Sequence, residues 1–137
     1  MLTDPYFSTD RNVDRLLEQY KLHGKLIVAF DFDDTIYDYH KKGYGYDKVR
    51  MLLLQCHNIG FSLIMLSTKE DDGELQANKE EAACIIGIPP KVIWVNEGPI
   101  MPKAKKPFFN IYLDDKAGLG QAYDILNQTV QLIKRQG

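Results

Sequence analysis

The chain has 137 residues, of which 45% are hydrophobic and 26% are charged. This size and composition are typical of one globular domain around a single core, and two independent domains would need more residues. The formal net charge of −2 gives no basic excess, so nucleic acid is not indicated as a partner.

The sequence patterns do not indicate a membrane span, a signal peptide or a disulfide. No stretch approaches the roughly 20 apolar residues of a membrane span, and the first residues lack the apolar core of a signal peptide. Cys56 and Cys84 are not arranged as a CxxC pair, so we expect buried free thiols of a cytoplasmic protein rather than a disulfide.

Apolar runs alternate with helical hydrophobic patterns along the chain. In chain order they predict a helix over 13–20, a strand over 26–30, a helix over 49–56, a strand over 61–66, a helix over 75–86, strands over 92–95 and 111–113, and a helix over 123–133. Gly24, Gly60 and Gly87 follow the first three helices and are expected to end them. Trp94 is expected in the core.

Strands separated by helices imply right-handed crossovers and a parallel sheet. The sequence therefore predicts an α/β fold: a single Rossmann-like domain over residues 1–137, with a mainly parallel sheet and helices on both faces. In such sheets, ligands bind outside the carboxyl ends of the strands.

Polar residues gather at those predicted strand ends. Because the carboxyl ends share one edge of the sheet, we expect their side chains to converge. The residues are Asp31, Asp33, Asp34 and Thr35 after the first strand, Ser67 and Thr68 after the second, and Asp114 and Asp115 after the fourth.

So many carboxylates at one edge require retained protons or a bound cation, since two unit charges 4 Å apart repel by about 4 kcal/mol at an effective dielectric of 20. Oxygen ligands without His or Cys favour Mg²⁺. Carboxylates, Mg²⁺, a hydroxyl and lysines together suit a phosphate group. In an extended segment Asp31 and Asp33 face the same side, so one can act as a nucleophile and the other as a general acid and base.

Three segments of the chain carry a resemblance to a known family. Residues 28–35, VAFDFDDT, resemble the first motif of the haloacid dehalogenase superfamily, an apolar strand followed by DxDx(T/V). Residues 64–67, IMLS, are similar to its second motif. Residues 106–117, KPFFNIYLDDKA, resemble its third and fourth motifs, a lysine and then a strand ending in an acidic pair. The resemblance covers about residues 26–117 in the family's order.

The resemblance implies a phosphatase of the small capless type that works through an aspartyl-phosphate. Asp31 would be the nucleophile and a metal ligand, and Asp33 would be the general acid and base, with its backbone carbonyl on the metal. Ser67 and Lys106 would hold the phosphate. Asp114 would bind Mg²⁺ and Asp115 would support it. Thr68 remains an alternative to Ser67, and Lys103 and Lys105 remain alternatives to Lys106.

The spacing of these motifs argues against a cap domain. Only 31 residues separate Thr35 from Ser67, and 38 separate Ser67 from Lys106, and each interval must already hold a helix and a strand. A short flap over 36–46, with tyrosines at 37, 39, 44 and 46, is either an aromatic clamp on the substrate or an ordinary packed hairpin.

The expected substrate is therefore a phosphorylated small molecule or an exposed phosphoester on a larger one, and a homo-oligomer is possible. Two other functions stay open. One is a catalytically inactive binding module of the same fold. The other is a receiver-like phospho-acceptor domain, but its residue order differs. In receivers the acidic pair follows the first strand, the phosphorylated Asp a middle strand and the lysine the last strand, whereas here the candidate lysine precedes the final acidic pair.

Overall fold

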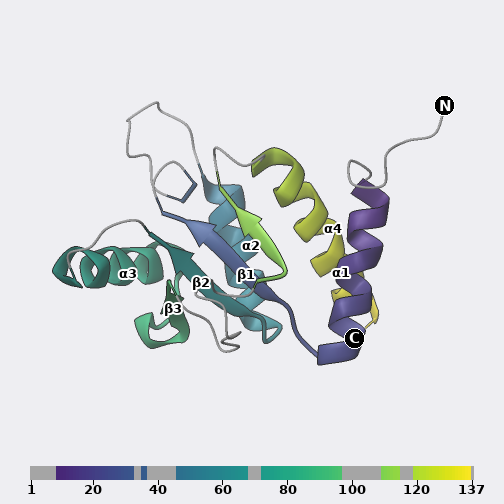
Figure 1. The fold of residues 1–137 in the computed structure, drawn as a ribbon, viewed down its shortest axis with the longest axis horizontal. Helices are drawn as coiled ribbons and strands as arrows, with labels where there is room; N and C mark the ends of the chain where they lie inside the picture. Colours follow the sequence, from purple (N-terminus) through teal and green to yellow (C-terminus); the bar gives the residue numbers. More distant parts are fainter. Residues whose placement is uncertain are drawn as a thin grey trace.

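A computed structural model describes residues 9–32, 35–36, 46–67, 72–96, 109–114 and 119–136. Helices and strands alternate along most of these ranges (Figure 1). The elements are α1 (Thr9–His23), β1 (Ile27–Asp31), α2 (Asp47–Asn58), β2 (Ser62–Leu66), α3 (Asp72–Ile86), a short 3-10 helix η2 (Pro90–Val92), β3 (Ile93–Val95), β4 (Ile111–Leu113) and α4 (Leu119–Gln136).

The four strands form one sheet in the order β3-β2-β1-β4, and every pair is parallel. β1 lies between β2 and β4, with Asp31 opposite Leu66 and Phe30 opposite Leu113. The α/β class and the parallel sheet are thereby confirmed. β1 extends one residue further than predicted, so Asp31 is the last residue of the strand.

Three helices end where glycines predicted their ends. Gly24, Gly60 and Gly87 have positive φ angles of 76°, 93° and 91°. The N–H of Gly24 donates to Tyr20 O at 2.7 Å, and that of Gly87 donates to Ala83 O at 2.8 Å. A left-handed residue after a helix satisfies carbonyls of the last turn, and glycine adopts it at the lowest steric cost.

The core lies between the helices and one face of the sheet, which we call the first face. Buried residues of α1, α2, α3 and α4 belong to the same cluster as the sheet residues of this face, which are Val28, Phe30, Leu63, Met65, Ile93, Ile111 and Leu113. The opposite, second face carries a smaller cluster of Ile27, Ala29 and Ile64, against which Leu66, Phe109 and Tyr112 pack.

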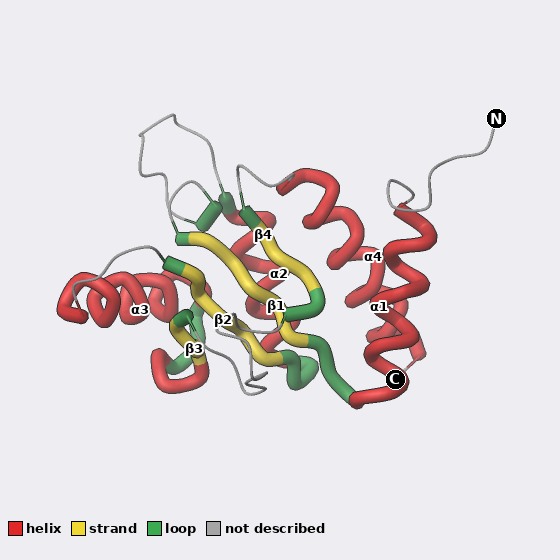
Figure 2. Tube along the Cα trace, in the orientation of Figure 1, coloured by secondary structure: helices red, strands yellow, loops and turns green. Residues whose placement is uncertain are grey.

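Within the described ranges, the helices therefore cover the first face, whereas cover on both faces was expected. The strand order gives the reason: β1, β2 and β3 follow one another in a single direction, and right-handed crossovers then place α2 and α3 on the same face. α4 contacts both α1 and α2 on that side. Figure 2 is viewed onto the second face, with α2 behind the strands.

Two predictions about burial were wrong. Trp94 is 41% exposed rather than in the core. It lies opposite Ile64 on the edge strand β3 and so belongs to the second face, where none of the described helices packs. Cys84 is exposed on α3, whereas Cys56 is buried on α2, and both are free thiols.

Most of each interval between the motifs is taken up by elements of the domain itself. Outside the described ranges lie residues 33–34 and 37–45 between β1 and β2, residues 68–71 between β2 and α3, and residues 97–108 between β3 and β4. The predicted flap over 36–46 lies outside the described residues except at its two ends. None of the described helices combines the length and apolarity needed to cross a bilayer.

Candidate functional site

Three predicted site residues lie at the carboxyl ends of adjacent strands. Asp31 is the last residue of β1, Ser67 directly follows β2, and Asp114 directly follows β4. Because Asp31 pairs with Leu66 and Phe30 pairs with Leu113, the registers bring Ser67 and Asp114 to either side of the end of β1. All three side chains are half-buried. The sheet thus gathers two carboxylates and a hydroxyl at one edge, although Asp31 and Asp114 are far apart in sequence.

The strand alternation continues past the end of β1. Phe30 and Phe32 both belong to the core cluster of the first face, and Phe32 is only 6% exposed. Since successive side chains of an extended segment point to opposite sides, Asp31 lies on the side opposite these two phenylalanines. Phe32, the apolar residue inside the DxD motif, therefore anchors the strand end in the core, and Asp31 lies on the other side of the strand.

The residues that follow the DxD motif are also anchored. Ile36 is fully buried, and its N–H donates to Phe32 O at 3.3 Å. Arg50 Nε of α2 donates to Ile36 O at 2.8 Å. A helix next to the site thus holds the backbone just after the motif.

Thr35 contributes a buried hydroxyl to this region. The residue is fully buried, and among the described residues its Oγ1 has no hydrogen-bond partner. An unsatisfied buried hydroxyl costs about 1–3 kcal/mol, and native proteins contain few such groups. Thr35 therefore places an unused donor and acceptor within the predicted first motif.

Asn96 is part of this edge, and the sequence patterns did not indicate it. It follows β3 and has a positive φ of 56°. Its side-chain Oδ1 accepts a hydrogen bond from Ser67 N at 2.7 Å, and its own N–H donates to Met65 O at 3.0 Å. The only local signal is that asparagine tolerates the left-handed conformation better than most residues. The contact with Ser67 spans 29 positions and depends on the pairing of β2 with β3.

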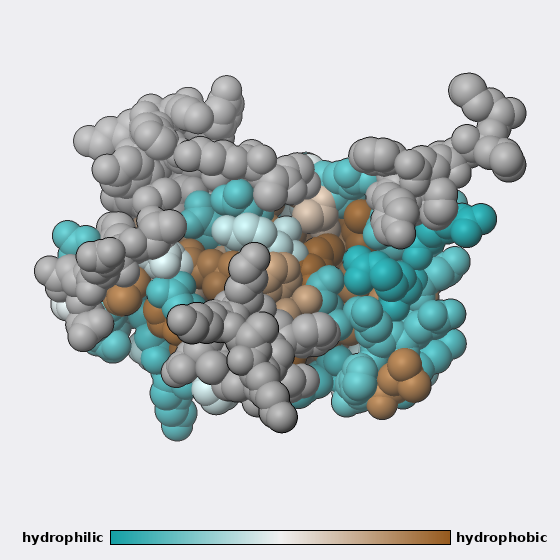
Figure 3. Space-filling model, viewed as in Figure 1, coloured by the Kyte–Doolittle hydropathy of each residue, from teal (hydrophilic) through white to brown (hydrophobic). Residues whose placement is uncertain are grey.

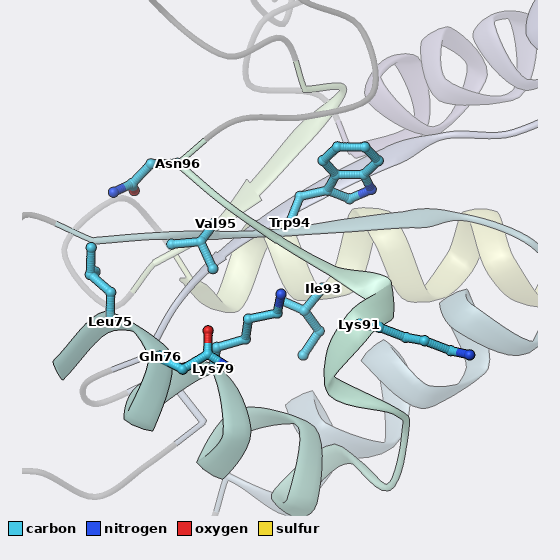
Figure 4. A pocket seen from close by; sticks show the side chains of 8 residues that line it. All are labelled: Leu75, Gln76, Lys79, Lys91, Ile93, Trp94, Val95 and Asn96. Carbon is cyan, nitrogen blue, oxygen red and sulfur yellow. The ribbon is translucent and has the colours of Figure 1, made fainter. Parts of the chain in front are cut away.

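A cavity of about 520 Å³ lies between α3 and β3. In Figure 4, Leu75 and Lys79 extend from α3 toward β3, and Asn96 lies at the end of β3 that carries the candidate site. The cavity is lined by Leu75, Gln76, Lys79, Lys91, Ile93, Trp94, Val95 and Asn96. It touches the site through Asn96, while its other lining residues come from α3, η2 and the edge strand β3.

The described carboxylates fit Mg²⁺ in their chemistry. Mg²⁺ usually takes one or two carboxylates and keeps several waters, and Asp31 and Asp114 supply two half-buried carboxylates from neighbouring strands. Within the described ranges, no group of three or more His, Cys, Asp or Glu side chains is placed to hold a metal ion. Two of the four predicted ligands, Asp33 and Asp115, lie outside these ranges, as do Thr68 and the lysines at 103, 105 and 106.

Comparisons of the chain with protein-family models, with curated proteins and with solved structures gave no significant match.

Proposed function

We propose that this chain is a Mg²⁺-dependent phosphomonoester hydrolase that forms an aspartyl-phosphate on Asp31. The observation that carries the proposal is the position of Asp31, Ser67 and Asp114 at the carboxyl ends of β1, β2 and β4. This is the edge at which parallel sheets bind their ligands. The order of the motifs along the chain, which resembles that of the haloacid dehalogenase superfamily, supports the same reaction.

In the proposed reaction, an oxygen of Asp31 attacks the phosphorus atom and forms the new P–O bond while the bond to the alcohol breaks. Asp33 donates a proton to the leaving alcohol oxygen. Asp33 then takes a proton from the water that attacks the phosphorus of the aspartyl-phosphate, which releases phosphate, restores the Asp31 carboxylate and returns Asp33 to its protonated form. Positioned acid–base catalysis of this kind contributes about 10²- to 10⁴-fold.

The remaining residues bind rather than react. The Ser67 hydroxyl and Lys106 hold phosphoryl oxygens, and Asp114, supported by Asp115, is a metal ligand together with Asp31. Mg²⁺ held by these carboxylates would neutralise charge on the phosphoryl oxygens. The half-burial of Asp31, Ser67 and Asp114 supports a site that substrate reaches directly.

The short intervals between the motifs support an open site without a cap domain. We therefore include in the proposal a phosphorylated small molecule, or a phosphoester exposed on a larger substrate. A cytoplasmic setting is part of it as well, because there the free thiols of Cys56 and Cys84 would stay reduced. A second subunit covering the site belongs to the same proposal.

The test is hydrolysis of an aryl phosphate by the purified protein. We expect phosphate release with Mg²⁺, loss of activity in a chelator, and recovery when Mg²⁺ is restored. Asp31→Asn should lower kcat by at least about 10³-fold because it removes the nucleophile. Asp124→Asn is the matched control, since Asp124 is an exposed carboxylate on α4, and it should retain wild-type activity.

Turnover that survives Asp31→Asn would contradict the assigned nucleophile. A wild-type protein that binds Mg²⁺ but hydrolyses none of a panel of nucleotides, sugar phosphates and phosphopeptides would contradict the enzyme proposal and support a binding module instead. Intact-mass spectrometry of acid-quenched protein adds a second readout, because a phosphoryl group on Asp31 should appear in the wild type and not in Asp31→Asn.

A further inference from the structure

The end of β3 is joined to the end of β2 by a side chain rather than by backbone alone. The N–H of Asn96 donates to Met65 O at 3.0 Å, which continues the regular parallel pairing of Met65 with Val95. In a parallel ladder, the next bond would run from Ser67 N to the main-chain oxygen of Asn96. The structure shows Ser67 N donating to Asn96 Oδ1 instead, at 2.7 Å.

The backbone conformation of Asn96 explains this exchange. Its φ of 56° is left-handed, so the chain leaves the strand at this residue and the main-chain carbonyl no longer continues the ladder. The side-chain amide takes over the acceptor role. Asparagine is one of the few residues that both tolerates this conformation and carries an acceptor on a short side chain. Asn96 is exposed, so packing in the core does not account for the residue.

The bond has a direct effect on Ser67. Ser67 follows the last residue of β2, and a hydrogen bond to its N–H limits rotation about the backbone torsions on either side of it. Those torsions set the direction of the Cα–Cβ bond and therefore the position of the hydroxyl. The hydrogen bond to Asn96 uses the N–H of Ser67, so it fixes the backbone that carries the hydroxyl without involving the hydroxyl itself.

We propose that Asn96 is a positioning residue for the candidate active site, one that holds Ser67 so that its hydroxyl meets the phosphoryl group. This inference rests on the proposed phosphatase function and adds to it a residue outside the four recognised motifs. Asn96 acts through Ser67 and does not itself touch the reacting atoms.

A double-mutant cycle tests whether Asn96 acts through Ser67. Asn96→Gly removes Oδ1 and keeps a residue that adopts positive φ freely, and Ser67→Ala removes the hydroxyl. We expect Asn96→Gly to lower kcat/KM for an aryl phosphate by about tenfold to a hundredfold, since small misplacements of a binding group have effects of this size. In the Ser67→Ala background, the same substitution should change kcat/KM by less than about twofold.

Equal effects of Asn96→Gly in both backgrounds would overturn the inference, because they would mean that Asn96 acts on stability or on another group. Melting temperatures, measured alongside, ensure that all four proteins are folded at the assay temperature. A wild-type protein without turnover would overturn the proposed function itself, before any Asn96 variant is compared. The two failures are therefore distinguishable.

Amide hydrogen exchange provides a readout that does not depend on turnover. In the wild type, the Ser67 N–H should exchange more slowly than expected for an exposed strand end. Asn96→Gly should remove that protection, while Asn96→Asp, which keeps a side-chain oxygen at the same position, should retain it. A Ser67 N–H that exchanges equally fast in the wild type and in Asn96→Gly would overturn the inference even in a folded, active protein.

Discussion

Asn110 and Asn96 lie at opposite ends of the parallel sheet, and each accepts a backbone N–H through its side-chain oxygen at 2.7 Å. Asn110 lies just before β4, at the amino end of the strands, and its partner is Ile27, the first residue of β1. Asn96 lies just after β3, at the carboxyl end, and its partner is Ser67. The chemistry of the two bonds is the same, but their surroundings differ.

The bonds of Asn110 join three elements of the fold. Its N–H donates to Ile27 O at 2.8 Å, its Oδ1 accepts from Ile27 N, and its Nδ2 donates to Gln19 Oε1 of α1 at 2.7 Å. Ile27 is only 2% exposed. This asparagine therefore connects β4 to β1 and the sheet to α1. Its hydrogen bonds stabilise the amino end of the sheet.

The carboxyl end holds polar groups whose proximity opposes stability. Asp31 and Asp114 are half-buried carboxylates on neighbouring strands, and Thr35 has a buried hydroxyl without a partner among the described residues. Asn96 orders this edge by one bond to Ser67. Substitutions at the two ends should therefore separate stability from activity.

Among the further substitutions that distinguish the two ends, the largest effect is expected from Asp114→Asn at the carboxyl end. Loss of one negative metal ligand should raise the Mg²⁺ concentration needed for half-maximal hydrolysis by at least about 100-fold, the upper range for changes to groups that merely support metal ligands. Calorimetric titration with Mg²⁺ checks the affinity directly. Asp14→Asn, at an exposed carboxylate of α1, is the control and should bind Mg²⁺ as the wild type does. Unchanged Mg²⁺ affinity in Asp114→Asn would contradict the metal site.

The next largest effect is expected at the amino end, from Asn110→Ala. The substitution leaves the N–H of buried Ile27 without its acceptor, which costs about 1–3 kcal/mol in the free energy of unfolding. Urea titration followed by circular dichroism measures that loss. Asn127→Ala on α4, where the amide makes only a 3.3 Å bond to Gln131, should cost less than about 0.5 kcal/mol. The kcat/KM of folded Asn110→Ala should stay within about twofold of the wild type. A larger loss would show that the amino end of the sheet affects activity as well as stability.

The smallest expected effect concerns the core that lies between the two ends. Burial raises the pKa of the Cys56 thiol from 9.0 to about 12, and a backbone hydrogen bond of Cys56 offsets part of this rise. The unfolded chain therefore loses this proton at a lower pH than the folded chain does, so the free energy of unfolding falls as the pH rises above 9.0.

Between pH 8 and pH 9.5, this thiol should remove about 1 kcal/mol of stability. Urea titrations of the wild type and of Cys56→Ala across that range isolate the contribution, because other titrating groups are common to both proteins. The wild type should lose stability more steeply. Equal slopes would indicate that the thiol is not buried as the structure shows.

Much of the fold followed from local patterns in the sequence. Gly24, Gly60 and Gly87 marked helix ends because a positive φ there favours glycine, a preference that does not depend on the rest of the chain. The run from Leu26 to Phe30 marked the central strand because it is buried on both faces. Asp31, Ser67 and Asp114 were predicted to meet because strand ends share an edge, and the registers bring them there.

What escaped prediction depends on the order of the strands. Trp94 was expected in the core because it lies in an apolar run, but β3 is an edge strand and the described helices pack on the first face. Asn96 escaped because its partner, Ser67, is brought to it by pairing of β2 with β3. Neither strand order nor side-chain contacts across strands leave a periodic signal in the sequence.

The exposure of Trp94 has a practical consequence. The space-filling view onto the second face shows hydrophobic side chains over the centre of the sheet and hydrophilic ones over α1 (Figure 3). Trp94 is the only tryptophan of the chain, lies on this face opposite Ile64, and precedes Asn96 by two residues. Its indole is half in water and half against the protein, so its emission is sensitive to small shifts of β3. The molecule thus carries its own fluorophore one strand away from Ser67, and ligand titrations at the candidate site need no added label.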